Sequence, residues 1–349
     1  MSPKTRKVTQ KEIAQLAGVS QTTVSMVLND RDGTNVRIPD ATRERVKRAI
    51  EQSTYVADPA ARRLAGLDNK IIGIFTYEPA LSPESMDFYG PLLTGLERAA
   101  EEAQCDLLFF TSSPVEEGRR RLFHRQTRLR LADGCVLLGQ SMDGGDLERL
   151  VDEGFPFVAV GRRDETASRV PYVGIDYASM TGGLVDQAYA RGHRRGLYVH
   201  RDTDSPAARD RRAQIASSAA TLGIQIPEAV ARDDLAPLVA RAQAGDATVF
   251  FAEDTFLAED LAHALHRSGL SVPDDISLAA LGEVRGHVVA GHTLSGFHIP
   301  RTRVAAAALD LVQSLIHLPA DEWSAIEVQQ LLSGTVEPGD TLASPASER

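Results

Sequence analysis

A stretch near the N-terminus concentrates side chains that can hydrogen-bond to nucleic acid. The segment 21–29, QTTVSMVLN, places Gln, Thr and Ser between apolar residues at three- and four-residue spacing, which predicts an amphipathic helix. Amide and hydroxyl groups of this kind bond both to phosphate oxygens and to the edges of bases. We therefore expect residues 21–29 to form a recognition helix that contacts DNA.

The residues around this segment predict the elements that hold it. Apolar residues at helical spacing, over 13–17 and again over 46–50, predict a helix on each side. Gly18 permits a tight turn after the first helix, and Ser20 can accept hydrogen bonds as the N-cap of the recognition helix. Residues 1–54 thus have the pattern of a helix-turn-helix headpiece.

Basic and acidic residues are distributed unevenly along the chain. The 349 residues carry a net charge of −10, but residues 1–66 contain 12 Lys and Arg against 7 Asp and Glu, a balance of +5, which leaves −15 for residues 67–349. A basic head can face phosphates, whereas an acidic body is repelled by them and limits nonspecific binding. This asymmetry favours a nucleic-acid partner for the N-terminal part alone.

From residue 71 onward, short apolar runs alternate with amphipathic helical patterns. Runs typical of buried parallel strands occur at 71–75, 107–111, 136–139, 157–160, 197–199 and 249–252. Helical patterns between them include 92–103, 180–191 and 256–268. The βαβ order predicts a doubly wound α/β body, and the number of strands suggests two such units.

Two further segments differ in composition from the headpiece and the body. Residues 55–68 link the two, and within them Pro59 can start a short conditional helix that Gly66 would stop. The tail 338–349 is polar and rich in Pro and Ser, and we expect it to be disordered.

Nothing in the sequence indicates secretion, a membrane span, a metal site or a cofactor. The basic N-terminus is not followed by a signal-peptide-like apolar stretch, and no segment approaches 18 apolar residues, so we expect a cytoplasmic protein without a membrane partner. Cys105 and Cys135 lie in or beside apolar runs, and we expect both to be reduced. His263 and His266 share a helix face without further ligands, and we expect surface histidines there.

The order of these features resembles the lactose-repressor (LacI/GalR) family of bacterial transcriptional regulators over nearly the whole chain. The segments that carry the resemblance are VTQKEIAQLAGVSQTTVSMVLN, TRERVKRAI, YVADPAARRLAG, DGCVLLG, VPYVGIDY, GHRR and GLSVPDDISLAALG. The resemblance implies a repressor whose affinity for operator DNA is controlled by a small-molecule effector. It also implies a periplasmic-binding-protein-like core over 69–337. The expected N-lobe spans about 69–174 and 301–328, and the expected C-lobe about 175–300 and 329–337.

For DNA binding, the resemblance implies a homodimer that places two recognition helices in successive major grooves of a pseudo-palindromic operator. The aligned base-reading positions are Gln21, Thr22 and Met26. The positions suited to phosphate contact are Thr9, Ser20, Thr23, Ser25 and Asn29. Ser20 can equally be only a helix cap, and Ser25 or Asn29 can be only solvated. Leu64 aligns with the leucine that wedges into a central base step when the family's hinge helices form on DNA, and an ordinary flexible linker is the alternative.

The chain departs from the family pattern at two places in the headpiece. Met26 replaces the usual arginine and can offer only apolar contact to a thymine methyl group, so we expect a different operator sequence. The loop 30–40 is about four residues longer than usual by alignment with the family pattern, and Arg37 within it can reach a phosphate or remain solvated.

In the family the effector lies between the lobes, beyond the carboxyl ends of the strands. The residues expected to bind it here are Phe88, Tyr89, Arg162, Arg211, Glu253, Asp254 and Glu283. Arg211 aligns with the family's effector-binding arginine, although Arg209 and Arg212 compete with it. Glycine 282 replaces the usual aspartate and Glu253 the usual asparagine, so a plain sugar bound in the usual way cannot be assumed.

Two other classes of protein use a similar α/β body. An enzyme would need a nucleophile, phosphate or zinc motif, and the sequence contains no G-x-S-x-G, Walker, G-x-G-x-x-G or H-E-x-x-H pattern, so we expect no catalytic activity. A solute-binding protein of a transport system would need a secretion signal and would not carry the headpiece. The sequence leaves open which effector is bound and whether it releases or promotes DNA binding.

Overall fold

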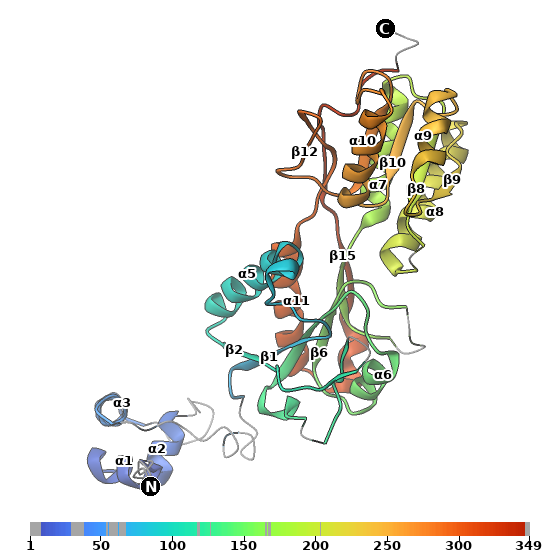
Figure 1. Cartoon of the computed structure of the whole chain (residues 1–349). Coiled ribbons are helices and arrows are strands. Elements are labelled where there is room, and N and C mark those ends of the chain that lie inside the picture. The colour runs from blue at the N-terminus through green and yellow to red at the C-terminus, as the bar shows by residue number, and fades with distance from the viewer. Residues whose placement is uncertain are drawn as a thin grey trace. The chain divides into compact units, whose positions relative to one another are not determined.

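The computed structural model of the chain (Figure 1) describes residues 8–28, 38–53, 55, 62, 68–116, 119–125, 127–164, 166, 169–202 and 204–345. Its contacts divide the chain into two compact units. Unit 1 comprises Met1–Ile71 with Leu131–Asp133, and unit 2 comprises Ile72–Arg130 with Gly134–Arg349. The headpiece helices belong to unit 1, and almost all of the α/β body belongs to unit 2.

The headpiece contains the three helices that its apolar spacing predicts. They are α1 (Gln10–Ala17), α2 (Gln21–Leu28) and α3 (Asp40–Glu51). Ile13, Val24 and Val46, one from each helix, are fully buried against one another. Gly18 ends α1 with a φ of 66°, a left-handed conformation that glycine adopts without steric cost. The turn between α1 and α2 is therefore set by this residue.

One sheet of the body forms the N-lobe. Its strands, in spatial order, are β15 (Gln329–Leu332), β7 (Tyr172–Ile175), β6 (Phe157–Val160), β5 (Gly134–Leu138), β1 (Ile71–Thr76) and β2 (Asp106–Phe109). The pairs β15–β7, β7–β6, β6–β5 and β5–β1 are parallel. Val136 and Leu138 pack with α5 (Met86–Glu102) and α11 (Arg301–Ile316), while Cys135 and Leu137 pack with α6 (Gly144–Asp152). The sheet is thus covered on both faces, as a doubly wound fold requires.

A second sheet forms the C-lobe. Its strands, in spatial order, are β16 (Thr335–Glu337), β14 (Ser295–His298), β11 (Ser277–Glu283), β10 (Val249–Ala252), β8 (Gly196–His200) and β9 (Glu228–Val230). All neighbouring pairs are parallel except β14–β16. The helices of this lobe are α7 (Tyr177–Ala190), α8 (Pro206–Leu222), α9 (Ala236–Gln243) and α10 (Thr255–Arg267). One face packs on α7 and α8 and the other on α9 and α10, which confirms the prediction of two doubly wound lobes.

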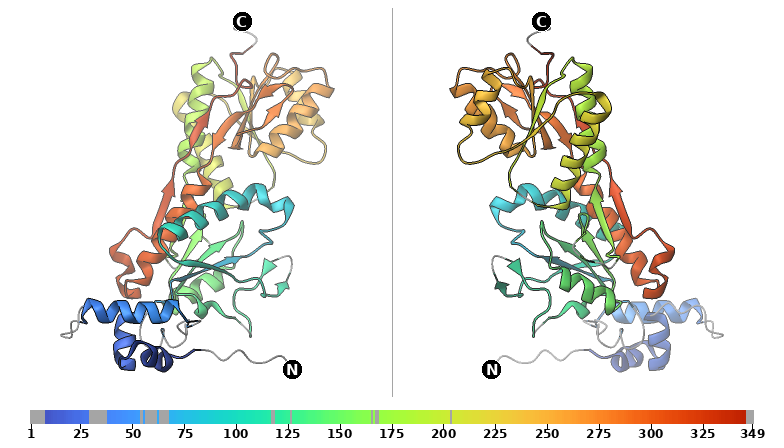
Figure 2. Two further views of the ribbon diagram at one scale, coloured as in Figure 1. Left: turned by 90° about the vertical axis from the view of Figure 1, so that its left-hand side faces the viewer. Right: turned by 90° about the vertical axis from the view of Figure 1, so that its right-hand side faces the viewer.

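The last crossing of the chain from the N-lobe to the C-lobe lies further along the sequence than predicted. Residues 329–332 were expected in the C-lobe, but they form β15, which pairs with β7 at the edge of the N-lobe sheet. The C-lobe strand β16 begins only at Thr335, and Figure 2 shows this C-terminal segment running from one lobe into the other. The sequence Gln-Gln-Leu-Leu did not indicate a strand because an edge strand need not form an apolar run.

The connection from β2 to β5 also departs from the βαβ pattern. Where a crossover helix is usual, the described residues form a short hairpin of β3 (Val115–Glu116) and β4 (Arg119–Arg120), followed by the 3-10 turn η2 (Leu129–Leu131). The α6 face of the N-lobe sheet is therefore covered at this place by irregular chain.

The prediction of a disordered tail is wrong for residues 338–345. Thr341 and Leu342 are buried, and Leu342 packs in the core of the C-lobe. The Thr341 hydroxyl oxygen accepts a hydrogen bond from the amide of Ser295 at 2.9 Å, and Ser277 donates to the carbonyl of residue 343 at 3.0 Å. These contacts are nonlocal, so the polar composition of the tail could not reveal them. Residues 346–349 lie outside the described part of the chain.

Both cysteines have free thiols. Cys135 is fully buried in β5, and burial raises the pKa of its thiol, while Cys105 is half-buried. Across the described residues, no helix is both long and apolar enough to cross a membrane.

Candidate DNA-recognition surface and effector site

The recognition helix α2 presents polar side chains on its outer surface. Val24 and Val27 anchor it in the headpiece core, whereas Gln21 and Thr22 are exposed. Met26 is half-buried, as is Ser25. Gln21 and Thr22 begin the helix and are exposed, which is compatible with the prediction that they read base edges.

Two predicted phosphate-contacting residues also stabilise helix starts. The Ser20 hydroxyl accepts the amide of Thr23 at 3.1 Å and bonds to the Thr23 hydroxyl at 2.9 Å. The Thr9 hydroxyl accepts the amide of Glu12 at 3.3 Å, and the Glu12 carboxylate accepts the backbone amide of Thr9 at 2.8 Å, which forms a capping box. Ser20 and Thr9 therefore have structural roles in the headpiece, and DNA contact would be additional.

Three residues named for DNA binding lie outside the described part of the chain. These are Asn29, Arg37 and Leu64. Their assignments remain predictions based on the resemblance.

On the N-lobe side, a carboxylate follows the first strand. Glu78 accepts the Tyr89 hydroxyl at 2.6 Å and the backbone amides of Gln140 and Ser141 at 3.3 and 3.4 Å. Tyr89 is only 2% exposed, and desolvation together with the bond to Glu78 raises the pKa of its hydroxyl. Tyr89 thus organises the loops after β1 and β5 from within the core.

Ion pairs connect the two lobes beside α8. Arg162, which follows β6 of the N-lobe, contacts Asp210 of α8 and also Asp164 at 2.9 Å. Arg209 of α8 reaches back to Asp164 at 3.4 Å. Burial is the largest influence on Asp210 and raises the pKa of its carboxyl, against the lowering effect of Arg162. Arg162, predicted to bind effector, is engaged in this cross-lobe network.

The three competing arginines of α8 have different surroundings. Arg209 pairs with Asp204 at 2.8 Å, and Arg212 lies 3.1 Å from the Glu228 carboxylate. Arg211 stacks over the ring of Tyr177, with its guanidinium carbon 3.9 Å from the ring centre. Its Nε is buried without a hydrogen-bond partner among the described residues, a feature it shares with the Nε atoms of Arg162 and Arg212. Arg211 differs from Arg209 and Arg212 in that no carboxylate pairs with it among the described residues.

Two acidic residues predicted to bind effector, Glu253 and Asp254, accept hydrogen bonds from other groups of the C-lobe. Glu253 is 4% exposed and accepts the Tyr198 hydroxyl and the Arg201 amide, both at 3.3 Å. The Asp254 carboxylate caps α10 by accepting the amide of Leu257 at 2.8 Å. Both carboxylates hold the lobe's own loops in place.

Glu283 belongs to a group that joins the lobes on another side. Its carboxylate accepts the amide of Ile299 at 2.8 Å and lies 3.3 Å from His298 and 3.8 Å from Arg301. The Arg301 guanidinium in turn lies 5.3 Å from the ring centre of Phe88 on α5. Phe88 and Glu283, both predicted to bind effector, are thereby linked through Arg301.

The position of the usual aspartate has no room for one. A Cβ added to Gly282 would lie 2.8 Å from the Thr255 hydroxyl and 3.1 Å from the Thr255 amide. Thr255 itself donates to the carbonyl of Glu283 at 2.5 Å. The glycine is therefore required by the close approach of α10, and a carboxylate is not available there.

Sequence reasoning did not identify several residues of this region. Glu78, Tyr177, Asp210 and Arg301 each touch a predicted site residue. Glu78 could have been found, because it comes directly after a buried strand at the edge where ligands bind. Asp210 could be found only from the fold, since its partner is distant in sequence.

Three family models match the chain. The model of bacterial regulatory proteins of the lacI family matches residues 9–58. The model of periplasmic binding proteins and the sugar-binding domain of the LacI family matches 80–229, and that of the periplasmic binding protein-like domain matches 185–342. Together they cover both the headpiece and the two-lobed body.

Known proteins with the same organisation match nearly full length. The transcriptional regulator PtxS of Pseudomonas plecoglossicida is 27% identical over 310 residues, which are 87% of each chain. The Lac repressor dimer bound to operator and the anti-inducer ONPF aligns with a TM-score of 0.70 at 18% identity, over 97% of this chain and 100% of that one. The regulator CelR in complex with cellobiose aligns with a TM-score of 0.59 at 22% identity, over 96% and 100%. The chain belongs to the lacI family of DNA-binding transcriptional regulators, with a helix-turn-helix headpiece and a periplasmic-binding-protein-like effector domain.

Proposed function

We propose that this protein is a homodimeric repressor whose operator affinity is controlled by a small oxygen-rich molecule, such as a sugar or sugar acid, bound by Arg211 between the lobes. The observation that carries the proposal is the environment of Arg211, which stacks on Tyr177 without a carboxylate partner among the described residues, while Arg209 and Arg212 are paired with carboxylates. A hydroxyl or carboxylate oxygen of the effector would accept a charge-assisted hydrogen bond from this guanidinium.

The surroundings of Arg211 narrow the chemistry of the effector. The ring of Tyr177 supports the guanidinium from one side. The carboxylates of Glu253 and Asp254 already accept hydrogen bonds from the protein, and position 282 offers no carboxylate. Recognition would therefore depend more on donors such as Arg211 than on acidic groups, which favours effectors rich in acceptors.

On DNA, Gln21 and Thr22 would read bases, with apolar contact from Met26. Thr9, Ser20, Thr23, Ser25 and Asn29 would contact phosphates, and Leu64 would wedge between bases at the centre of the operator. A binding role of this kind needs no catalytic step, and a chromosomal target places the protein in the cytoplasm.

The test uses calorimetry on the full-length protein with a panel of sugars and sugar acids that includes cellobiose. Arg211→Ala should weaken binding of the selected compound by about 1.5–3 kcal/mol, the usual loss for a charged hydrogen bond, without changing operator affinity in a mobility-shift assay. Arg212→Ala is the matched control on the same helix, because its ion pair with Glu228 lies within the C-lobe, and it should bind nearly as the parent does. Normal binding by Arg211→Ala with loss in Arg212→Ala would show that the effector contacts a different arginine.

A further inference from the structure

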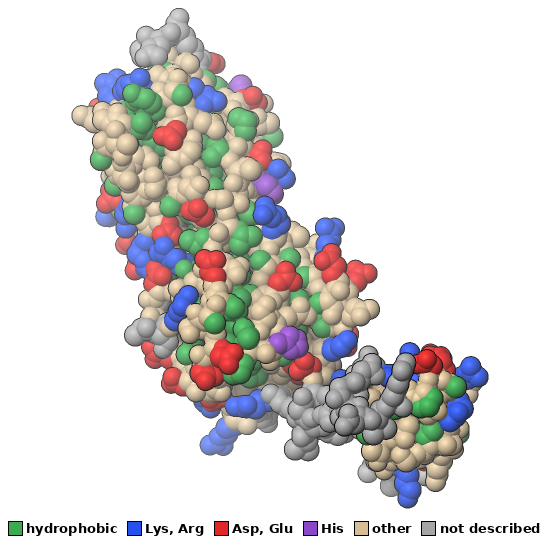
Figure 3. Space-filling view, turned by 180° about the vertical axis from the view of Figure 1, so that it is seen from behind, with side chains coloured by type: hydrophobic (Ala, Val, Ile, Leu, Met, Phe, Trp, Pro, Cys, Tyr) green, Lys and Arg blue, Asp and Glu red, His purple; other side chains and the backbone are tan. Residues whose placement is uncertain are grey.

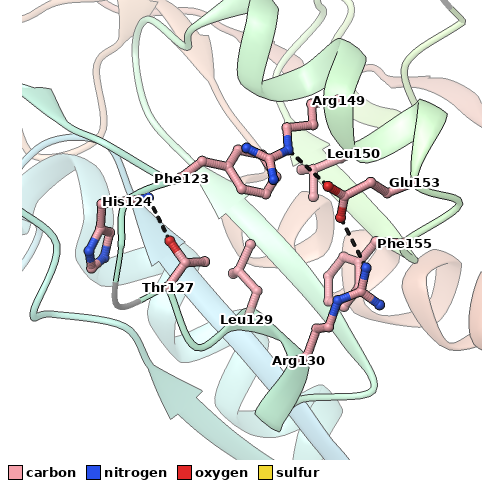
Figure 4. Close-up of a pocket in the computed structure, with 9 residues that line it drawn as sticks. All are labelled: Phe123, His124, Thr127, Leu129, Arg130, Arg149, Leu150, Glu153 and Phe155. Atoms are coloured by element: carbon pink, nitrogen blue, oxygen red, sulfur yellow. Dashed lines mark hydrogen bonds and ion pairs between the residues drawn. The ribbon is translucent and has the colours of Figure 1, made fainter.

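A cavity lies in the N-lobe, away from the ends of the strands that face the C-lobe. Its volume is about 450 Å³, inside the roughly 300–1,000 Å³ range of small-molecule sites. Figure 4 shows its apolar walls and the ion pairs along one side. The walls come from Phe123, Leu129, Leu150 and Phe155. Leu129 precedes β5 and Phe155 precedes β6, so the cavity is at the amino ends of these strands, opposite the edge that carries the effector site.

The cavity lies on the face that the irregular β2–β5 connection covers. Right-handed crossovers would place a helix between β2 and β5 on the same face as α6. The described chain instead covers this region with the segment that contains Phe123 and Leu129. This connection spans residues 110–133, and its described part contains only the single 3-10 turn η2 as helix. Its Phe123 and Leu129 line the cavity together with Leu150 of α6 and Phe155, which precedes β6.

The charged side of the cavity has a net positive charge. Glu153 accepts hydrogen bonds from Arg149 at 2.8 Å and from Arg130 at 3.0 Å, so two guanidinium groups share one carboxylate. The Arg149 guanidinium also stacks on Phe123, 3.9 Å from the ring centre. Arg149 contacts Glu153 through Nε, and its side chain is 57% exposed, so its two terminal amino groups can approach a ligand.

We propose that this cavity binds a small aromatic carboxylate. The carboxylate would bond to the terminal amino groups of Arg149, whose paired donors match it in bidentate geometry. The flat ring would lie against Phe123, Leu129 and Phe155, where it is removed from water. Because Arg130 and Arg149 together carry more charge than Glu153, a carboxylate should bind more tightly than an uncharged analogue of the same shape. Such a ligand would act in addition to the effector bound between the lobes.

The experiment measures binding of benzoate and 2-naphthoate to the full-length protein by calorimetry, with benzamide as the uncharged analogue. We expect saturable 1:1 binding of 2-naphthoate per chain, tighter than that of benzoate because more apolar surface is buried, and at least about tenfold weaker binding of benzamide. Arg149→Gln should weaken the carboxylates by about tenfold or more. Because Arg149 is largely exposed, this variant should unfold at the parent's temperature.

Two control variants locate the bound carboxylate. Arg98→Gln changes an exposed arginine of α5 outside the cavity and should bind like the parent. Arg211→Ala, in the predicted effector site, should also retain binding. The proposal is overturned if neither carboxylate binds, if Arg149→Gln binds them as the parent does, or if Arg211→Ala abolishes binding. If Arg149→Gln fails to fold, Phe123→Leu provides the test instead, because it keeps an apolar wall but removes the aromatic ring under Arg149. This variant should bind the carboxylates more weakly than the parent does.

Discussion

At the scale of single residues, the structure shows which of the predicted site residues are already bonded within the protein. Alignment alone left Arg209, Arg211 and Arg212 in competition, and only their partners distinguish them, a carboxylate for Arg209 and Arg212 and the Tyr177 ring for Arg211. Conversely, the sequence named Tyr89 as an effector contact, whereas the structure buries it and bonds its hydroxyl to Glu78. The sequence predicts at which end of a strand a residue lies, but it does not predict which group the side chain bonds to.

Whether Ser20 contacts DNA as well as capping α2 can be tested by one substitution. Aspartate caps helices as well as serine does, so Ser20→Asp should preserve thermal stability, whereas Ser20→Ala should cost about 1 kcal/mol. If Ser20 also contacts a phosphate, the new carboxylate should repel DNA and weaken operator binding more than alanine does. Thermal melts and fluorescence anisotropy on operator DNA measure the two effects separately. Equal operator affinity in the aspartate variant and the parent would assign Ser20 to the cap alone.

At the scale of elements, the apolar strands and long helices were predictable, and the weakly patterned ones were not. The strands at 157–160 and 249–252 coincide with β6 and β10 because buried parallel strands form continuous apolar runs. The edge strand β15 and the β3–β4 hairpin have no such pattern. Local sequence therefore located the core of each lobe but not the edges, which depend on partners far along the chain.

The anchored tail leads to a prediction about stability. Deleting residues 340–349 removes the buried side chain of Leu342 and the hydrogen bond of Thr341 to Ser295. Burial of one leucine contributes about 1.5–3 kcal/mol and each hydrogen bond about 1 kcal/mol, so the free energy of unfolding of the C-lobe should fall by about 2–5 kcal/mol. Urea denaturation provides the measurement.

A shorter deletion serves as the control for the tail. Removing residues 346–349 leaves all of these contacts in place and should not change the unfolding midpoint. An unchanged midpoint after the longer deletion would mean that the tail does not pack on the C-lobe in solution.

At the scale of the whole molecule, regulation requires that the lobes can change their arrangement. The pairs of Arg162 with Asp210 and of Arg209 with Asp164 connect the lobes of unit 2. On the face drawn in Figure 3, acidic and basic side chains are interspersed over the body. Ion pairs between the lobes therefore involve individual residues and not one large patch of a single charge. These pairs would bias the ligand-free protein toward the arrangement observed here.

Asp210→Asn tests this bias. The amide keeps the shape of the side chain but removes the charge opposite Arg162, and for a partly exposed pair the effect should be about 1 kcal/mol. We expect a broader distribution of distances between fluorescent labels placed on α6 and α9, measured by single-molecule energy transfer. Asp204→Asn is the control, because Asp204 pairs with Arg209 inside the C-lobe and is 81% exposed. If the two variants give the same distribution, the cross-lobe pair does not control the arrangement.

We infer that the chain recognises a specific DNA sequence through α2. The most direct measurement is selection of bound duplexes from a randomised pool by the full-length protein, followed by fluorescence anisotropy on the selected and a scrambled duplex at physiological salt. We predict a pseudo-palindromic site bound about 10³-fold or more tightly than the scrambled duplex. Gln21→Ala and Thr22→Ala should reduce that ratio. Equal affinity for the two duplexes, or a selected pool without any common sequence, would show that α2 does not select a DNA sequence.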